Sequence, residues 1–526
     1  MSSIFALAYR RPRASLPPHS EPRAPRRHGA EQIYGVNLRA RTGKWRVEPQ
    51  RLKLGRRLVQ RGVARARVGS GTGVRTRRDE EPVGEADWGP SPYDPSPQVA
   101  FLLMALTGPP GHVAIIGGGL AGLTLALALH DLNISSTVYE ARSEDFDQGG
   151  GVMLSPNALR VLDSVGVYKR VRDNSLQFDV LTFKDGQDQT TDEYYFGSEK
   201  LYGYQAIRIM RKELLDEMKA MLRERHIPIH YDSRLTTITS DGPDQVEFAF
   251  ANGQVASAPL VIGADGIHST VRQTFLPEVK PIYAGFMGIN SVVQRSQLRI
   301  PDGYKLPATV MAKPGAFLLV PQKPDGSELF IGSQRRFAEL DSAGWEALRK
   351  DKQKLYDMLQ ENKSDWPDVV QSALEAMPVD RMGFWAFYGI PPLASWLSES
   401  KRIILVGDAA HAIPPTAGQG ANQAFEDVRA LATLLSKLSP DVPLDKAAAQ
   451  WQAYRQDRIK KVLDLTQQMN AKRLPESERA KLPPGAIWSD QSLTRGDGGE
   501  LRWLYDPDLA QEAENWVQEL KQAAHS

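Results

Sequence analysis

Three glycines and one glutamate have the types and spacing that bind a dinucleotide. Gly117, Gly119 and Gly122 follow the pattern G-x-G-x-x-G, and Glu140 stands 23 positions after Gly117. In such a loop the first glycine permits a tight turn, the second lets the backbone approach a pyrophosphate, and the third allows close packing of a helix on a sheet. The N-terminus of the following helix favours phosphate charge. A carboxylate at this distance accepts hydrogen bonds from a ribose diol, so the pattern predicts a dinucleotide site.

A β-α-β unit is needed to position these residues. Residues 113–116 form a short apolar, β-branched run that is typical of a buried parallel strand, and residues 123–130 continue as a helix without Gly or Pro. Residues 136–139 form the next apolar run and end directly before Glu140. The glycines and the carboxylate are therefore expected at the same edge of one sheet.

A second motif, GADGIHSTVR at 263–272, follows the apolar run 260–262 and precedes a helix. Asp265 and Gly266 favour a tight turn, and Ser269 is a candidate helix cap. An isolated Asp-Gly pair is usually only a turn, whereas the whole ten-residue string is far more restrictive.

A third motif, GDAAHAIPPTAGQGAN at 407–422, follows the apolar strand predicted at 403–406 and leads into a long helix. Asp408 at the end of that strand is placed to bond a hydroxyl group. The 418–422 stretch offers backbone N–H groups at a helix N-terminus, where an anion or a redox ring that gains negative charge is stabilised. Pro414 and Pro415 stiffen the approach to this site.

Together the three motifs closely resemble those of the class A FAD-dependent monooxygenases, the flavoproteins similar to p-hydroxybenzoate and salicylate hydroxylases, and the sequence looks most like the fungal members. The resemblance covers residues 110–475 in the family's order. It implies a protein that binds FAD, uses NAD(P)H and O2, and transfers one oxygen atom to a small aromatic substrate. Because the transferred oxygen is electrophilic, a phenol-like ring is the leading expectation.

The resemblance also implies roles for single residues. The three glycines would surround the FAD pyrophosphate and Glu140 would bind the adenosine ribose. Arg211 would lie near the phosphates and ribitol, and Asp265 belongs to a motif shared between FAD and NAD(P)H binding. Asp408 would hold the ribitol, and 414–420 would border the isoalloxazine. The full set of expected cofactor residues is Gly117, Gly119, Leu120, Ala121, Gly122, Glu140, Arg142, Gly151, Arg211, Asp265, Asp408, Pro414, Gly418, Gly420, Ala421 and Asn422.

The chain departs from the family at one position. Many salicylate hydroxylase-like members carry a histidine immediately before the Arg, and here that residue is Met210. Tyr202, Tyr204 and Arg208 lie nearby and are the candidate catalytic residues, because a Tyr–Arg pair can deprotonate or orient a phenol. The alternative for each is a structural role. His411, inside the third motif, is expected to be structural.

Other kinds of site receive no support from the sequence. No His/Asp/Glu spacing indicates a metal site, and no G-x-S-x-G elbow is present. The chain contains no cysteine, which excludes disulfides and a cysteine nucleophile. No apolar run reaches the 18 or more residues of a membrane span.

The formal net charge of +2 hides an uneven distribution. Residues 1–78 hold 18 Arg and 2 Lys against 3 acidic residues, which leaves −15 for the rest of the chain. An acidic body argues against nucleic acid as a partner. Residues 1–103, rich in Arg and Pro, are expected to be disordered. Three interpretations stay open: an extension outside the functional protein, a mitochondrial presequence, and a nucleic-acid-binding arm. We expect a cytoplasmic protein, or a mitochondrial one if the extension is a transit peptide; the sequence does not indicate the oligomeric state.

The expected fold class is α/β: a Rossmann-like FAD-binding domain of the glutathione reductase type, with an inserted sheet-rich substrate domain and C-terminal helices. The FAD-binding domain is assigned to residues 110–174, 207–280 and 399–475, and the substrate domain to 175–206 and 281–398. Residues 476–526 form a C-terminal tail with a helix. A cleft between the two domains is the expected ligand site.

Within this interpretation other activities stay open. Epoxidation of an alkene is the second candidate. A flavoprotein reductase or dehydrogenase without oxygen transfer, and a catalytically silent FAD-binding protein, are the others.

Overall fold

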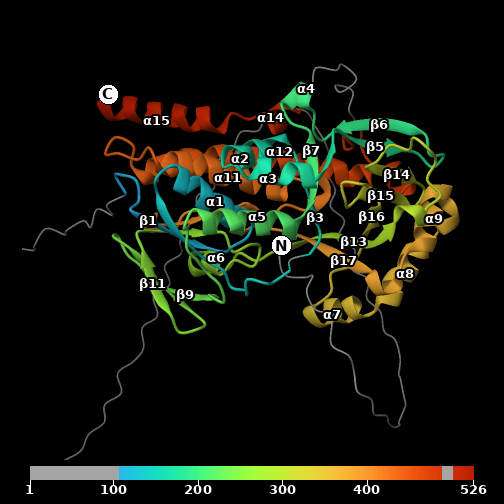
Figure 1. Cartoon of the computed structure of the whole chain (residues 1–526), viewed down its shortest axis with the longest axis horizontal. Coiled ribbons are helices and arrows are strands. Elements are labelled where there is room, and N and C mark those ends of the chain that lie inside the picture. The colour runs from blue at the N-terminus through green and yellow to red at the C-terminus, as the bar shows by residue number, and fades with distance from the viewer. Residues whose placement is uncertain (1–105, 148, 489–500) are drawn as a thin grey trace, which may run out of the picture. The chain divides into compact units, whose positions relative to one another are not determined.

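The computed structural model describes residues 106–147, 149–488 and 501–526 (Figure 1). The arginine-rich segment 1–103, and with it the expectation of disorder, lies outside the described residues. Among the described helices, none combines the length and the apolar character needed to cross a membrane.

A five-stranded parallel sheet positions the predicted dinucleotide site. Its strand order is β18-β12-β1-β2-β8. The strands are β18 (Ile403–Leu405), β12 (Leu260–Gly263), β1 (His112–Ile116), β2 (Ser135–Tyr139) and β8 (Ile229–His230). All neighbouring pairs are parallel. The ends of β1, β2, β12 and β18 therefore bring the three predicted motifs to one edge of the sheet, as the sequence predicts.

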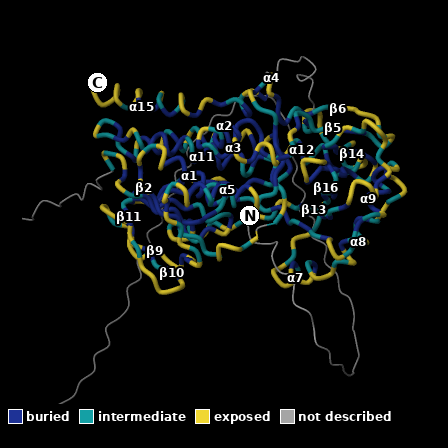
Figure 2. Tube along the Cα trace, in the orientation of Figure 1, coloured by how far each residue is buried: buried dark blue, intermediate teal, exposed yellow. Residues whose placement is uncertain are grey.

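Helices cover the faces of this sheet. Helix α1 (Leu120–Asp131) packs on β2, on α5 (Arg211–Glu224) and on α11 (Gly420–Leu435). Because α1 is enclosed by these neighbours, it is apolar on nearly all sides, and its residues from Leu123 to Leu129 are buried. Figure 2 shows the buried trace concentrated around α1 and α11, while the turn that joins β9 to β10 is exposed.

A second, mostly antiparallel sheet has seven strands in the order β17-β13-β16-β15-β14-β5-β6. The strands are β17 (Gly383–Gly389), β13 (Ile282–Gln294), β16 (Glu328–Arg336), β15 (Gly315–Pro321), β14 (Ala308–Ala312), β5 (Val180–Lys184) and β6 (Thr190–Tyr195). Apolar runs in the sequence predict strands at 308–312, 316–321 and 329–333, and these correspond to β14, β15 and β16.

The sequence predicts one helix at 344–362, but this segment forms two helices. They are α7 (Ser342–Lys350) and α8 (Lys352–Gln360). Asp351 separates them because its carboxylate accepts the Lys354 N–H at 3.0 Å and caps the second helix. Together with α9 (Asp368–Ala376) they contribute apolar side chains to the core of the seven-stranded sheet.

A three-stranded sheet in the order β3-β7-β4 links the two larger sheets along the chain. Its strands are β3 (Gly151–Leu154), β7 (Ala206–Met210) and β4 (Leu176–Phe178). The segment 175–206 is thus divided, since β4 pairs with β7 while β5 and β6 join the seven-stranded sheet. Residue alternation predicts these strands but does not specify their partners; the exact domain boundaries stay a prediction.

The remaining elements surround this framework. A small antiparallel sheet holds β9 (Leu235–Asp241), β10 (Val246–Phe250) and β11 (Val255–Ala258). The other helices are α2 (Pro156–Ser164), α3 (Val167–Val171), α4 (Glu199–Tyr202), α6 (Thr270–Phe275), α10 (Asp408–His411), α12 (Leu444–Lys472), α13 (Glu476–Arg479), α14 (Arg502–Tyr505) and α15 (Leu509–His525). Helix α11 packs on α2, α12 and α15.

Candidate functional site

The glycine loop between β1 and α1 has the geometry of an anion cradle. Gly117 has φ +114°, and a Cβ there would lie 2.4 Å from the carbonyl oxygen of Ala264. A Cβ on Gly122 would lie 1.9 Å from the carbonyl oxygen of Gly117. Gly119, by contrast, faces open space and precedes the uncapped N-terminus of α1. The first and third glycines are thus required by the fold, and the second leaves room for a ligand at the helix N-terminus.

Glu140 lies beside this loop at the end of β2. Its Oε2 accepts the Gly118 N–H at 2.7 Å and its Oε1 accepts the Arg142 N–H at 3.0 Å. Each carboxylate oxygen keeps a further lone pair. The side chain is therefore fixed at the cradle and can still accept hydrogen bonds from a diol.

A cavity of about 170 Å³ lies at this edge of the parallel sheet. Five of the predicted cofactor residues line it: Gly117, Gly119, Glu140, Arg142 and Asp265. Arg234 and His268 line the same cavity and are absent from the predicted set. Arg234 does not stand out in the sequence, because it comes from a loop 94 residues beyond Glu140, whereas His268 lies inside the 263–272 motif. The predicted Leu120 and Ala121 are not among the lining residues.

Asp265 shapes the turn that opens into α6. Its Oδ2 accepts the N–H groups of Thr270 at 2.7 Å and Val271 at 3.1 Å. Burial raises the pKa of this carboxyl above its usual value. The predicted cap Ser269 is confirmed, since its hydroxyl accepts the Arg272 N–H at 2.8 Å.

Asp408 and Arg211 come from distant parts of the sequence and lie near one another. Asp408 is the first residue of α10, three positions after the end of β18, and its negative charge favours the charged form of Arg211. Burial is the larger effect and lowers the pKa of Arg211. The Arg211 N–H donates to the carbonyl oxygen of Gly150 at 2.9 Å. Asp408, Arg211 and the 150–151 loop thus form one continuous wall.

The loop before α11 is tied to β3 through Asn422. Its Oδ1 accepts the Ser155 N–H at 3.0 Å, and its Nδ2 donates to the Gly418 carbonyl at 2.6 Å. The sequence makes Ser155 a cap candidate for a helix that starts near Pro156, and Ser155 does occupy the N-cap position of α2. Its hydroxyl makes no cap hydrogen bond, because it donates to Asn157 Oδ1 at 2.6 Å instead. Helix α11 begins at Gly420, so Gly420, Ala421 and Asn422 form its first turn, as the sequence predicts.

A buried network of charged side chains lies behind this loop, and the sequence analysis missed it. Asp427 Oδ2 lies 2.6 Å from His411 Nε2, and Asp427 Oδ1 accepts from Arg455 Nε at 2.8 Å. Glu426 accepts from Arg455, from Arg458 Nε at 2.7 Å, and from Asn157 Nδ2 at 2.7 Å. The sequence does contain a signal of this network: two adjacent carboxylates lie in the largely apolar α11, and two arginines spaced i, i+3 lie in α12. His411 is buried and held by Asp427, and its structural role stays a prediction.

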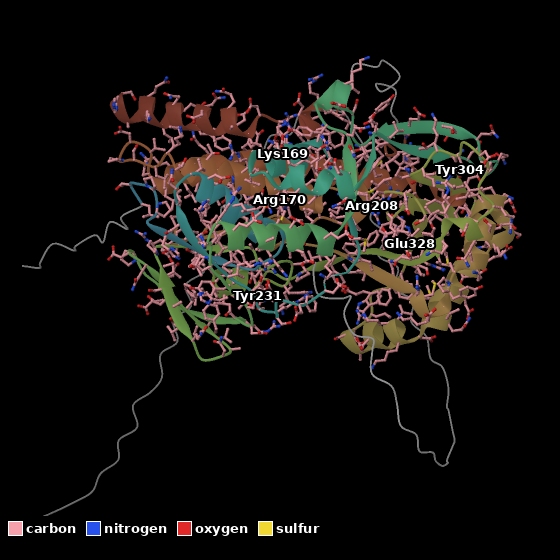
Figure 3. The ribbon with its side chains drawn as sticks, viewed as in Figure 1. Lys169, Arg170, Arg208, Tyr231, Tyr304 and Glu328 are labelled. Carbon is pink, nitrogen blue, oxygen red and sulfur yellow. The ribbon has the colours of Figure 1, made fainter. Side chains whose placement is uncertain are left out.

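The three candidate catalytic residues lie in separate environments. Arg208 on β7 is buried, and its Nε donates to Gln322 Oε1 at 2.9 Å. Figure 3 shows it at β7, on the side of the seven-stranded sheet. The Tyr204 hydroxyl donates to Asp163 at 3.0 Å, and the Tyr202 ring lies 5.1 Å from that of Tyr505. The predicted Tyr–Arg pair is not formed, because both tyrosines precede β7 and pack toward α2 and α14.

Residues 111–466 match the protein family described as the FAD binding domain. The chain belongs to the class A FAD-dependent monooxygenases. The monooxygenase is 28% identical over 408 residues to 3-amino-4-hydroxybenzoate 2-monooxygenase from Streptomyces platensis, covering 76% of this chain and 96% of the relative. It is 28% identical over 370 residues to 6-methylsalicylate 1-monooxygenase from Aspergillus terreus, covering 67% of this chain and 80% of the relative. The fungal type stays a prediction, since these relatives are bacterial and fungal.

Among solved structures, the monooxygenase is similar to a salicylate hydroxylase in its substrate complex. The TM-score is 0.61 at 21% identity, with 77% of this chain and 98% of that chain covered. This likeness shows the fold, a Rossmann-like FAD-binding fold with a sheet-rich second part. The residues present fit FAD: the cradle at Gly119 admits a pyrophosphate and Glu140 retains acceptor capacity toward a ribose. FAD is the cofactor of this enzyme.

Proposed function

We propose that the enzyme hydroxylates a small phenol-like aromatic compound, using NAD(P)H and O2. Two relatives are named for acting on 3-amino-4-hydroxybenzoate and 6-methylsalicylate, and both of those compounds are aromatic rings that carry a hydroxyl group. The observation that carries the proposal is that Asp408, Arg211 and the 150–151 loop are neighbours, while the Gly119 cradle lies at the same edge of the parallel sheet. We infer that these two groups hold an extended cofactor whose reactive ring lies next to the seven-stranded sheet.

We assign the cofactor contacts as follows. Gly117, Gly119 and Gly122 surround the pyrophosphate, and Glu140 accepts from the adenosine ribose. Arg211 and Asp408 hold the phosphates and ribitol. The remaining cofactor residues border the flavin ring: Gly151, Pro414, Gly418, Gly420, Ala421 and Asn422.

When bound, FAD supplies the activation of O2 for transfer of one oxygen atom to the substrate. The protein's own residues bind the cofactor and the substrate and orient them. The N-terminus of α11 at Gly420 presents backbone N–H groups that favour negative charge on the ring. Closely packed walls exclude water, which directs reducing equivalents to product rather than to peroxide. Of the candidate catalytic residues we assign a substrate contact to Arg208, and structural roles to Tyr202 and Tyr204.

The test uses purified, FAD-saturated enzyme with NADH or NADPH and isotopically labelled O2. We expect stimulated NAD(P)H oxidation with a phenolic compound and one labelled oxygen atom in the product. A labelled epoxide from an alkene would support the second candidate. NAD(P)H oxidation with no label in any product would instead support a reductase or dehydrogenase. We place the enzyme in the cytoplasm, with a mitochondrial location as the alternative, which imaging of a C-terminally tagged chain distinguishes.

A further inference from the structure

Arg208 is a buried guanidinium whose charge no carboxylate neutralises. The residue is 7% exposed, and burial lowers its pKa to about 10. Its Nε and Nη2 both donate to one oxygen, Oε1 of Gln322. Within residues 106–147, 149–488 and 501–526, it forms no ion pair and its Nη1 has no hydrogen-bond partner. An uncompensated charge in the interior is strongly unfavourable, so its presence calls for a binding partner.

Other buried arginines of this enzyme are compensated. Arg455 and Arg458 form ion pairs with Glu426. Arg272 donates to the carbonyl oxygens of Ala409 at 2.8 Å and Ile267 at 2.7 Å. Arg473 also lacks a carboxylate and its Nε has no hydrogen-bond partner, but it is the C-cap of α12, where the negative end of the helix dipole favours a cation. Arg208 lies within a strand and has no such compensation.

The guanidinium of Arg208 lies where the proposed flavin site meets the seven-stranded sheet. A Cβ on Gly151 would lie 2.9 Å from its Nη2, so the group is in close contact with the 150–151 loop. On the other side it lies 5.4 Å from the ring of Phe330 on β16, and Gln322 directly follows β15. A ligand beside the flavin ring and against the sheet would therefore reach Nη1.

We propose that Arg208 and Gln322 recognise the carboxylate of an aromatic acid, so that the enzyme selects acids over neutral phenols of the same shape. This inference rests on the proposed aromatic hydroxylation. Gln322 has a specific part: its amide oxygen orients the guanidinium but carries no charge, so Arg208 keeps a full positive charge for the ligand. The planar fork of an arginine matches a carboxylate, and such charge-assisted bonds are stronger than neutral ones.

The test compares matched pairs of an acid and its amide. The pairs are salicylate with salicylamide, and 4-hydroxybenzoate and 3-amino-4-hydroxybenzoate with their amides. Binding to the FAD-loaded enzyme is measured from the change in flavin absorbance. The wild-type enzyme should bind at least one acid more tightly than its amide by roughly ten- to a hundred-fold, the range expected for a charged hydrogen bond.

Gln322→Glu is the decisive variant because it keeps the shape of the side chain and neutralises Arg208. It should abolish the preference for the acid and leave affinity for the amide within about threefold. Gln177→Glu is the matched control. Gln177 is exposed on β4, the neighbour of β7, so the substitution adds the same charge outside the site. If Gln322→Glu does not retain FAD, Arg208→Gln provides the same comparison, and Arg208→Lys should restore part of the preference.

Three results would overturn the inference. One is an unchanged ratio of acid to amide affinity in Gln322→Glu or Arg208→Gln. Another is a wild-type enzyme that binds none of the acids; if it still hydroxylates neutral phenols, the proposed function stands and only this inference fails. The third is a Gln322→Glu variant whose flavin midpoint potential is lowered without ligand while its ratio of acid to amide affinity is unchanged. The anion that Arg208 meets would then be the reduced cofactor.

Discussion

The carboxylate of Asp427 connects His411 to the residue that precedes Asp408. Its Oδ2 lies 2.6 Å from His411 Nε2 and also accepts the Gly407 N–H at 2.8 Å. Asp427 belongs to α11, whereas Gly407 and His411 flank the turn that carries Asp408. One buried carboxylate therefore holds both sides of that turn, and α11 sets the position of a residue that we assign to the cofactor.

Asp427→Asn should destabilise the enzyme and weaken its hold on FAD. The substitution removes the charged partner of His411 and one of the two carboxylates that Arg455 contacts, and breaking a buried ion pair costs about 3–5 kcal/mol. The free energy of unfolding in urea and the FAD content after gel filtration measure the two effects. Asp457→Asn is the control, because Asp457 forms an exposed pair with Lys461 at 2.8 Å and its loss should cost at most about 1 kcal/mol. Equal stability of the two variants would contradict this role of Asp427.

Glu140→Ala should lower FAD affinity about ten- to a hundred-fold, because a lost hydrogen bond to a charged group costs about 1.5–3 kcal/mol. Turnover of the FAD-saturated variant should change less than affinity. Titration of the apoenzyme with FAD, followed by fluorescence, gives the dissociation constant. Glu144→Ala is the control, since Glu144 is a nearby exposed residue that pairs with Arg223 at 2.9 Å. Unchanged affinity in Glu140→Ala would remove this residue from the site.

Deletion of residues 1–103 should leave FAD binding and turnover intact. The segment has no core-forming pattern, and the enzyme's first described residues begin at Leu106, whose carbonyl accepts the Leu444 N–H at 2.9 Å. The truncated and full-length proteins are compared by flavin content and by NAD(P)H oxidation. A truncated protein that does not fold or bind flavin would place the extension inside the functional unit.

Features that depend on local geometry are predictable from the sequence. Residue type and spacing identify a turn that only glycine can form, as at Gly117. They also identify a hydroxyl that caps a helix, as at Ser269. The same holds for Asp265 and Asp408, because each lies two or three positions after an apolar strand of the parallel sheet. The chemistry of these sites needs those residues at the carboxyl ends of strands, where such sheets bind ligands.

Features that depend on pairing between distant segments are not predictable in this way. The two adjacent carboxylates in the apolar α11 indicate that cations neutralise them, but not that these cations are Arg455 and Arg458 of another helix. The burial of Arg208 likewise depends on Gln322, which stands 114 positions later and joins it only when the seven-stranded sheet forms. Periodicity predicts the strand at Leu176–Phe178 but not that it pairs with β7. The Tyr–Arg pair was inferred from sequence proximity, and the turn between α4 and β7 directs Tyr204 toward Asp163.

Asp408→Ala should weaken FAD retention and, in FAD-saturated enzyme, divert reducing equivalents to hydrogen peroxide. Asp408 follows a buried strand and lies near Arg211, so its carboxylate is fixed at the carboxyl edge of the parallel sheet. The substitution removes a cofactor hydrogen bond and leaves Arg211 without its negative neighbour. The flavin ring loses a constraint, and a misplacement of about 1 Å costs on the order of a hundred-fold in rate.

The measurement for Asp408 is the ratio of hydroxylated product to NAD(P)H oxidised, with excess FAD and catalase-based detection of peroxide. Asp408→Asn, which keeps the shape and a hydrogen-bonding oxygen, should fall between wild type and Asp408→Ala. Asp464→Ala, an exposed position on α12, is the control for loss of a surface carboxylate and should behave as wild type. This ratio, the coupling, depends on the placement of the flavin ring and not on how much cofactor is bound. A decrease in coupling at saturating FAD therefore separates an effect on positioning from an effect on affinity. Wild-type affinity together with wild-type coupling would make Asp408 a turn residue only.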